Sequence, residues 1–141
     1  DLELMRKLGG YRKDRKTGAE GFTLAGLLMF GKTESITDPE CAPDFMLDYR
    51  DIPSDTSITR WIDRIYPDGT WEANLFQFYR LVLPKLQAFM PKPFILKGDE
   101  RQDETPVHEA LREALINSLV HTLWWFYKDC YSETSHCYYH D

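Results

Sequence analysis

The feature that most constrains this chain is residues 105–121, TPVHEALREALINSLVH, whose composition and spacing predict a helix. Thr105 suits the N-cap position and Pro106 the first helical position. His108 stands where a capping box would place Glu or Gln, so that part of the N-terminal signature is absent. Most of the helix surface is apolar, through Val107, Ala110, Leu111, Ala114, Leu115, Ile116, Leu119 and Val120. This pattern predicts a helix that is buried on most sides.

Three polar residues interrupt this apolar surface. Glu113, Asn117 and His121 are spaced by four, which places them along one stripe of the helix. A carboxylate on a buried helix is costly unless it is paired, bound to a ligand or facing a cleft. The stripe is therefore the first candidate site. In the structural alternative, Glu113 pairs with a base such as Arg112, Asn117 caps a neighbouring backbone group, and His121 interacts with the helix dipole.

Two blocks of the sequence resemble a known bacterial family. Residues 110–121, ALREALINSLVH, are similar to the N-box of GHKL-type ATPase domains, in the form found in RecG-related helicases and transcriptional regulators. Residues 22–32, FTLAGLLMFGK, resemble the T-N-A-G-L-L-L-F-G-K segment that follows the Schlafen AlbA-type DNA-binding domain in those proteins. The distance between the blocks also fits. The resemblance implies that residues 1–104 form an interdomain α+β module after an absent AlbA-type domain, and that 105–141 begin a GHKL-like domain with an atypical tail.

The resemblance also implies roles for the polar stripe. Glu113 would be the base that activates the attacking water, Asn117 a Mg²⁺ ligand, and His121 part of the same cofactor-binding motif. The chain departs from the family after this point. Residues 122–124 read Thr-Leu-Trp instead of a small residue, Asp and an aromatic, and no glycine follows Gly98 to form a phosphate-binding lid. We therefore expect no cofactor and no catalysis in these 141 residues, and Mg-ATP only in the parent protein.

The distribution of charge identifies a second candidate. The net charge of −6 disfavours the chain as a whole as a nucleic-acid binder. Residues 6–16 are nevertheless basic, and four of their cations could contact phosphates: Arg12, Lys13, Arg15 and Lys16. The alternative is a solvated loop, because Gly9, Gly10 and Gly18 flank these residues. In the family that the chain resembles, DNA is bound by the N-terminal AlbA-type domain, which is absent from these residues.

The remaining composition limits compartment and partners. We expect no membrane partner, because no apolar run approaches the ~20 residues of a membrane span. An odd number of cysteines, three, fits a reducing cytoplasm. The start without Met suggests an excised piece. The tail, residues 122–141, is rich in aromatic residues, and it could bury them against a second copy in a homodimer. Its cysteines and histidines lack the spacing of a zinc site, so we expect no metal.

The patterns along the chain predict an α+β fold, with a small antiparallel or mixed sheet of two to three strands packed against a long helix and a C-terminal helix. The expected helices are residues 1–8, 24–30 between caps at Thr23 and Gly31, and a long helix after Thr70 with a kink or break at Pro84. The expected strands are residues 44–50, 58–66 and 94–97, with a polar loop before Gly21 and an acidic connector at 98–104. An aromatic stripe at Trp71, Phe78 and Tyr79 could stack bases, but its helical spacing favours core packing.

These observations leave three hypotheses. The first is a non-catalytic middle fragment of a DNA-binding transcriptional regulator or RecG-related protein, acting between domains and in dimerisation. The second is part of a GHKL-type ATP site that is active only in the full-length protein. The third is a nucleic-acid contact through residues 6–16.

Overall fold

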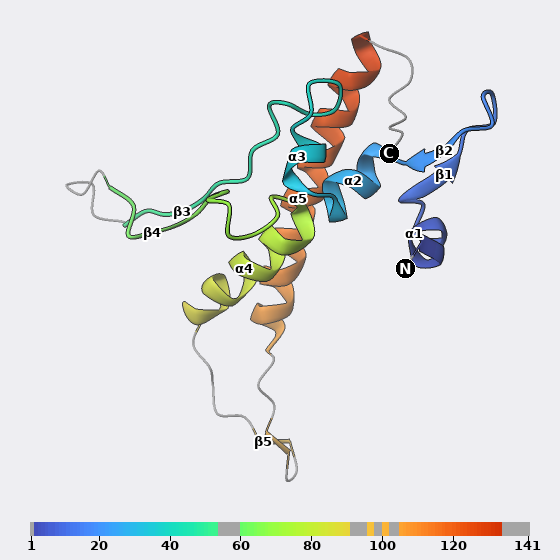
Figure 1. Cartoon of the computed structure of the whole chain (residues 1–141). Helices are drawn as coiled ribbons and strands as arrows, with labels where there is room; N and C mark the ends of the chain where they lie inside the picture. The colour runs from blue at the N-terminus through green and yellow to red at the C-terminus, as the bar shows by residue number, and fades with distance from the viewer. Residues whose placement is uncertain (1, 54–59, 91–95, 98–99, 102–104, 134–141) are drawn as a thin grey trace.

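The computed structural model describes residues 2–53, 60–90, 96–97, 100–101 and 105–133, with only the backbone described at 96–97, 100–101 and 122–133. The helices are α1 (Leu2–Lys7), α2 (Leu24–Phe30), α3 (Thr33–Ile36), α4 (Leu75–Ala88) and α5 (Pro106–Glu133). The strands are β1 (Tyr11–Lys13), β2 (Glu20–Phe22), β3 (Tyr49–Asp51), β4 (Asp63–Ile65), β5 (Leu96–Lys97) and β6 (Glu100–Arg101). The predicted α+β class with a C-terminal helix is confirmed. The described strands form three separate antiparallel pairs, and α5 is the long rod in the middle of Figure 1.

The first strand pair lies where the sequence predicted a loop. After α1, Gly9 takes a left-handed conformation with φ of 76°, and the chain enters β1. Strands β1 and β2 pair with Tyr11 opposite Phe22, and these two rings meet edge to face at 5.2 Å between centroids. The loop prediction was therefore wrong. Strands of three residues with only one apolar side chain each carry too little apolar alternation to be recognised.

Helix α2 has the predicted bounds and caps. The Thr23 hydroxyl accepts a hydrogen bond from the Gly26 N–H at 3.1 Å and donates one to the Gly9 carbonyl at 3.0 Å. Gly26 packs so closely against the backbone of Gly10 that a Cβ at Gly26 would lie only 2.6 Å from the Gly10 Cα. Only glycine fits at this position. The turn before β1 is thus held directly against α2.

The second pair, β3–β4, is shorter than the two predicted strands. The alternation predicted for 44–50 is present, since Phe45 and Leu47 are buried and Met46 is exposed. The ladder itself covers only Tyr49–Asp51 against Asp63–Ile65, because residues 44–48 pack their inward side chains against the helical core. Residues 54–59 lie outside the described part of the chain, so the start of the strand predicted at 58–66 falls there.

Helix α4 begins later than predicted. Residues 69–74 are not helical, and both the N–H and the hydroxyl of Thr70 donate to Asp68, at 2.9 and 2.6 Å. Asn74 is the N-cap, and its side-chain oxygen accepts from the Gln77 N–H at 2.9 Å. A kink or a break was predicted at Pro84, and the break does not occur: α4 continues through Pro84 to Ala88. Pro84 lies on the exposed side, where water can replace the lost backbone hydrogen bond.

The third pair, β5–β6, joins Leu96–Lys97 to Glu100–Arg101. The strand predicted at 94–97 is confirmed for its last two residues, and its first two lie outside the described residues. The predicted acidic connector contains β6 instead of being entirely irregular.

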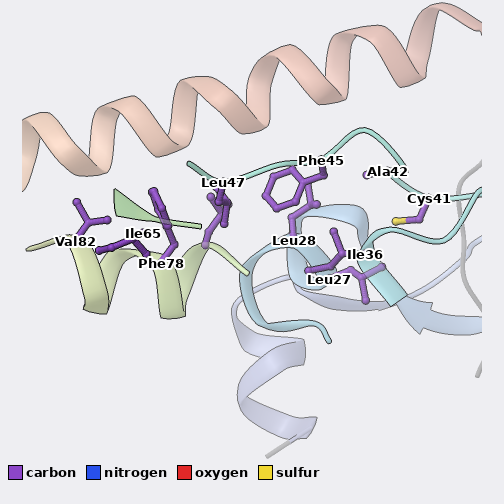
Figure 2. Packing of buried hydrophobic residues seen from close by; sticks show 11 residues of the cluster. Leu27, Leu28, Ile36, Cys41, Ala42, Phe45, Leu47, Ile65, Phe78 and Val82 are labelled. Atoms are coloured by element: carbon purple, nitrogen blue, oxygen red, sulfur yellow. The ribbon is translucent and has the colours of Figure 1, made fainter. Parts of the chain in front are cut away.

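One hydrophobic core joins α2, α3, α4, the end of β4 and the irregular segment 41–47. Figure 2 shows Phe45 and Leu28 between the ribbons of α5 and α2, and Val82 and Phe78 rising from α4. Phe78 stacks on the partly buried Trp71 at 6.1 Å between ring centroids, so this aromatic pair packs in the core as predicted. The buried cluster consists of Leu27, Leu28, Ile36, Cys41, Ala42, Phe45, Leu47, Ile65, Leu75, Phe78 and Val82.

Candidate functional site

The start of α5 is fixed by a buried polar pair. The Thr105 carbonyl accepts from the N–H groups of His108 and Glu109, at 2.9 and 3.2 Å, and Pro106 is the first helical residue as predicted. The Thr105 hydroxyl lies 2.7 Å from the His108 Nδ1, and both residues are buried. His108 therefore provides a hydrogen-bond partner for the Thr105 hydroxyl, at the position where a capping box would have Glu or Gln.

The prediction that α5 is buried on most sides was wrong. Over residues 106–121, only one stripe faces the core, and Leu115 and Leu119 pack against the buried cluster from it. Val107 and Val120 are 55% and 51% exposed. The reason is geometric: α5 has 28 residues and lies against α4, which has only 14, so one neighbouring helix covers one side of the rod.

The three predicted site residues of α5 share one exposed surface. Glu113, Asn117 and His121 are all exposed and lie on the side of the helix opposite Leu115. The structure brings them onto one stripe, as the spacing predicted, and leaves all three exposed. Their arrangement is an open ridge that another surface could cover.

The basic residues of the N-terminal region lie on a hairpin whose turn is held by hydrogen bonds. Asp14 is 5% exposed, and its carboxylate accepts from the Lys16 N–H at 2.9 Å and from the Thr17 hydroxyl at 2.7 Å. The Asp14 carbonyl also accepts from the N–H of Gly18, whose φ is 75°. This network closes the turn between β1 and β2.

The same turn presents the predicted cations to solvent. The four candidates are all exposed: Arg12, Lys13, Arg15 and Lys16. Arg6, at the end of α1, instead contacts groups of the same chain: its guanidinium lies 2.7 Å from the Glu20 carboxylate and over the Tyr11 ring. The hairpin therefore concentrates exposed positive charge at one end of the molecule, on the right of Figure 1.

Sequence reasoning missed a second cluster, on β3–β4. The Arg64 guanidinium donates to both Asp48 carboxylate oxygens, at 2.8 and 3.2 Å, and lies over the rings of Trp61 and Tyr66. These hydrogen bonds from Arg64, with a further one from Arg50, lower the pKa of the Asp48 carboxyl. The signal was available in the sequence RWIDRIY, where arginines and aromatic residues recur over residues 60–66.

A cleft of about 670 Å³ lies between α3 and the segment before α4. Its central carboxylate, Glu72, accepts from the N–H and the hydroxyl of Thr33, at 2.6 and 3.0 Å. These bonds lower the pKa of Glu72, with the bond from the Thr33 N–H contributing most. The Thr33 hydroxyl in turn accepts from the Ala73 N–H at 2.8 Å. The polar groups of the cleft thus join α3 to the start of α4, which is a structural role.

The described part of the chain holds neither a cluster of metal ligands nor a membrane-spanning helix. Among those residues, no group of three or more His, Cys, Asp or Glu side chains could hold a metal ion. Cys130 lies where only the backbone is described, and His136, Cys137 and His140 lie outside the described residues. None of the described helices is both long enough and apolar enough to cross a membrane.

Comparison with known proteins gives one match. A family model for a domain of unknown function, DUF8451, matches residues 1–48. This range contains α1, the β1–β2 hairpin, α2 and α3, so the basic hairpin lies within the matched region. No curated protein and no solved structure matches the chain.

Proposed function

We propose that this chain is a non-catalytic middle module of a DNA-associated transcriptional regulator of the RecG-related type. The supporting observation is that the two blocks carrying this resemblance, residues 22–32 and 110–121, contribute to the same hydrophobic core. Leu28 of α2 is 1% exposed within it, and Leu115 of α5 packs against it. Segments far apart in the sequence therefore belong to one structural unit. In this proposal, that unit connects a DNA-binding domain to a GHKL-like domain.

Within this module, the β1–β2 hairpin is the surface that contacts DNA phosphates. Its turn is held by Asp14, so the cations are presented on a backbone that binding does not have to order. The chain as a whole carries a net charge of −6, which repels DNA elsewhere and restricts attraction to this basic end. The contact is to phosphates, so it does not depend on base sequence.

The test is binding of a labelled DNA duplex, followed by fluorescence anisotropy at several salt concentrations. The variant combines Lys13→Gln, Arg15→Gln and Lys16→Gln, which leaves the Asp14 network in place. If all three contact phosphates, the slope of log K against log salt becomes shallower by about 3, because each contact releases roughly 0.9 counterions. At low salt the variant binds DNA more weakly than the wild type does, and at high salt the two affinities differ less.

The control is Lys32→Gln with Arg80→Gln, which removes two exposed cations away from the hairpin. This control is expected to keep the wild-type slope. An unchanged slope in the hairpin variant, or an equal loss in the control, would contradict the phosphate contact.

A second candidate, part of an ATP site in the full-length protein, is favoured by the exposed ridge on α5. Asn117 offers an amide oxygen, a donor type that Mg²⁺ accepts, and Glu113 offers a carboxylate four residues before it. Both are exposed, so a following domain could cover them. Calorimetry of the full-length parent with Mg-ATP is expected to show binding that Asn117→Ala abolishes and Ser118→Ala keeps. The absence of binding by the wild-type parent rules this candidate out.

A further inference from the structure

The β3–β4 arm has an outer face that combines apolar, aromatic and arginine side chains. Because Arg50 is paired with Arg64, alternation along the strands places Ile52, Ile62 and Tyr66 on the same face. Ile52 is 66% and Ile62 is 70% exposed. In Figure 1 the arm extends away from α5, on the side opposite the β1–β2 hairpin. Such a projecting apolar face is unusual for a surface that stays in water.

The charge of the arm argues against a nucleic-acid partner. Its described residues, 48–53 and 60–66, contain three arginines and three aspartates, so they have no net positive charge. Asp48 binds both Arg50 and Arg64, at 2.7 and 2.8 Å, and Asp63 binds Lys85 of α4. Exposed isoleucines beside Trp, Tyr and Arg are instead typical of the energetic centre of a protein–protein interface.

Helix α5 carries an exposed surface of acidic and apolar side chains, which complements the arginine and isoleucine side chains of the arm. Glu109, Glu113, Ile116 and Val120 follow one another at spacings of four, three and four, which places them in one line along the helix. All four are exposed, with Ile116 at 42% and Val120 at 51%. We call these four residues the acidic–apolar stripe. It combines two carboxylates at one end with two apolar side chains at the other.

We propose that the outer face of the β3–β4 arm docks on the acidic–apolar stripe of α5 in a second copy of this chain. The arm supplies Ile52 and Ile62 for the apolar end of the stripe. Arg60, which is exposed, supplies positive charge for Glu109 and Glu113. The contact forms between copies because the stripe and the outer face of the arm are both exposed within one chain.

Two-fold symmetry allows this contact to form twice in one dimer. Each copy carries one arm and one stripe, so a closed dimer forms the same arm-to-stripe contact twice. This doubling matters because a short hairpin on one helix covers less than the roughly 1,600 Å² that a stable interface usually buries. The inference concerns assembly and stands apart from the proposed contact with DNA.

Sedimentation equilibrium over a range of protein concentrations tests the proposal. The wild-type chain is expected to form dimers. An arm variant, Ile52→Asp with Ile62→Asp, and a stripe variant, Ile116→Asp with Val120→Asp, are each expected to raise the dimer Kd more than about tenfold. The control, Leu4→Asp with Leu8→Asp, changes two leucines that are 54% and 63% exposed near α1, and it should keep the wild-type Kd. Circular dichroism checks that all three variants are folded.

Mixing the two variants distinguishes this interface from other dimers. A mixed dimer retains one undamaged contact, between the intact arm of one copy and the intact stripe of the other. Each variant alone retains none, because every contact in it has one damaged side. Native mass spectrometry of an isotope-labelled arm variant mixed with the stripe variant is therefore expected to show mixed dimers in excess of both homodimers.

Three results would overturn the proposal. One is a wild-type chain that stays monomeric up to about 100 µM, a concentration at which even weak specific dimers form. Another is a dimer whose Kd is the same in the wild type and in both variants. The third is a mixture without excess mixed dimer, which would indicate arm-to-arm or helix-to-helix pairing.

Discussion

Single carboxylates connect separate segments of this molecule. Asp48 joins the segment before β3 to Arg64 of β4 at 2.8 Å, and Asp14 closes the hairpin turn. Glu72 joins the approach to α4 with the N-terminus of α3, which lies 39 residues earlier. The hydrogen-bond donors at Asp48 and Glu72 favour the ionised form of these two carboxylates. At Asp48 and Glu72 the pKa is accordingly lowered.

The lowered pKa of Glu72 predicts how stability depends on pH. The stabilisation from ionised Glu72 is fully present above its unfolded pKa, near 4.5, and is lost as pH falls through its lower folded pKa. Glu72→Gln removes this pH-dependent part. The variant should be less stable than wild type at neutral pH, and the difference should shrink below about pH 4.5. Urea unfolding between neutral and roughly pH 3 measures both curves.

Glu34→Gln provides the matched control, since it removes the same charge from an exposed neighbour on α3. Its unfolding curve should run parallel to that of the wild type through the acid range. If Glu72→Gln loses stability with falling pH as steeply as the wild type, the carboxylate of Glu72 does not have this role.

At the scale of elements, caps position the helices relative to one another. The buried side chain of Asn74 has two tasks in this respect. Its oxygen caps α4 by accepting from the Gln77 N–H, and its amide donates to the Gly31 carbonyl at the end of α2, at 2.9 Å. One side chain thus starts one helix and contacts the end of another.

Two substitutions separate these tasks. Asn74→Ala removes both bonds in a buried position and should destabilise the fold by about 2–3 kcal/mol. Asn74→Ser keeps an oxygen acceptor for the Gln77 N–H but removes the donor to Gly31, so its loss should be smaller, roughly half. Urea unfolding at neutral pH gives both values. Equal losses in the two variants would mean that the cap contributes nothing.

At the scale of the whole molecule, the core lies in the middle and the candidate surfaces project from it. Figure 1 shows the β1–β2 hairpin and the β3–β4 arm on opposite sides of α5, while Figure 2 shows α2 and α4 gathered beneath that helix. The proposed DNA contact uses the hairpin, and the proposed contact with a second copy uses the arm and α5. These two partners therefore approach different faces and need not compete.

The local sequence determined those parts of the structure whose signals lie within a few residues. The caps at Thr23 and Gly31 predicted α2 with the correct bounds, and Thr105 with Pro106 predicted the start of α5. The alternation of Phe45 and Leu47 with Met46 predicted which side chains face inward. Helix caps and side-chain alternation depend on near neighbours in the chain, so they can be recognised without the fold.

Tertiary structure alone decided which surfaces were covered and which segments were paired. The apolar composition of residues 105–121 predicted a buried rod, but one shorter helix covers only one side of it, so Glu113, Asn117 and His121 lie in the open. The arm cluster depends on Asp48 meeting Arg64, and the hairpin on Gly10 packing against Gly26. Burial and pairing between distant residues depend on how the elements pack together, and the pattern within any one element does not contain that information.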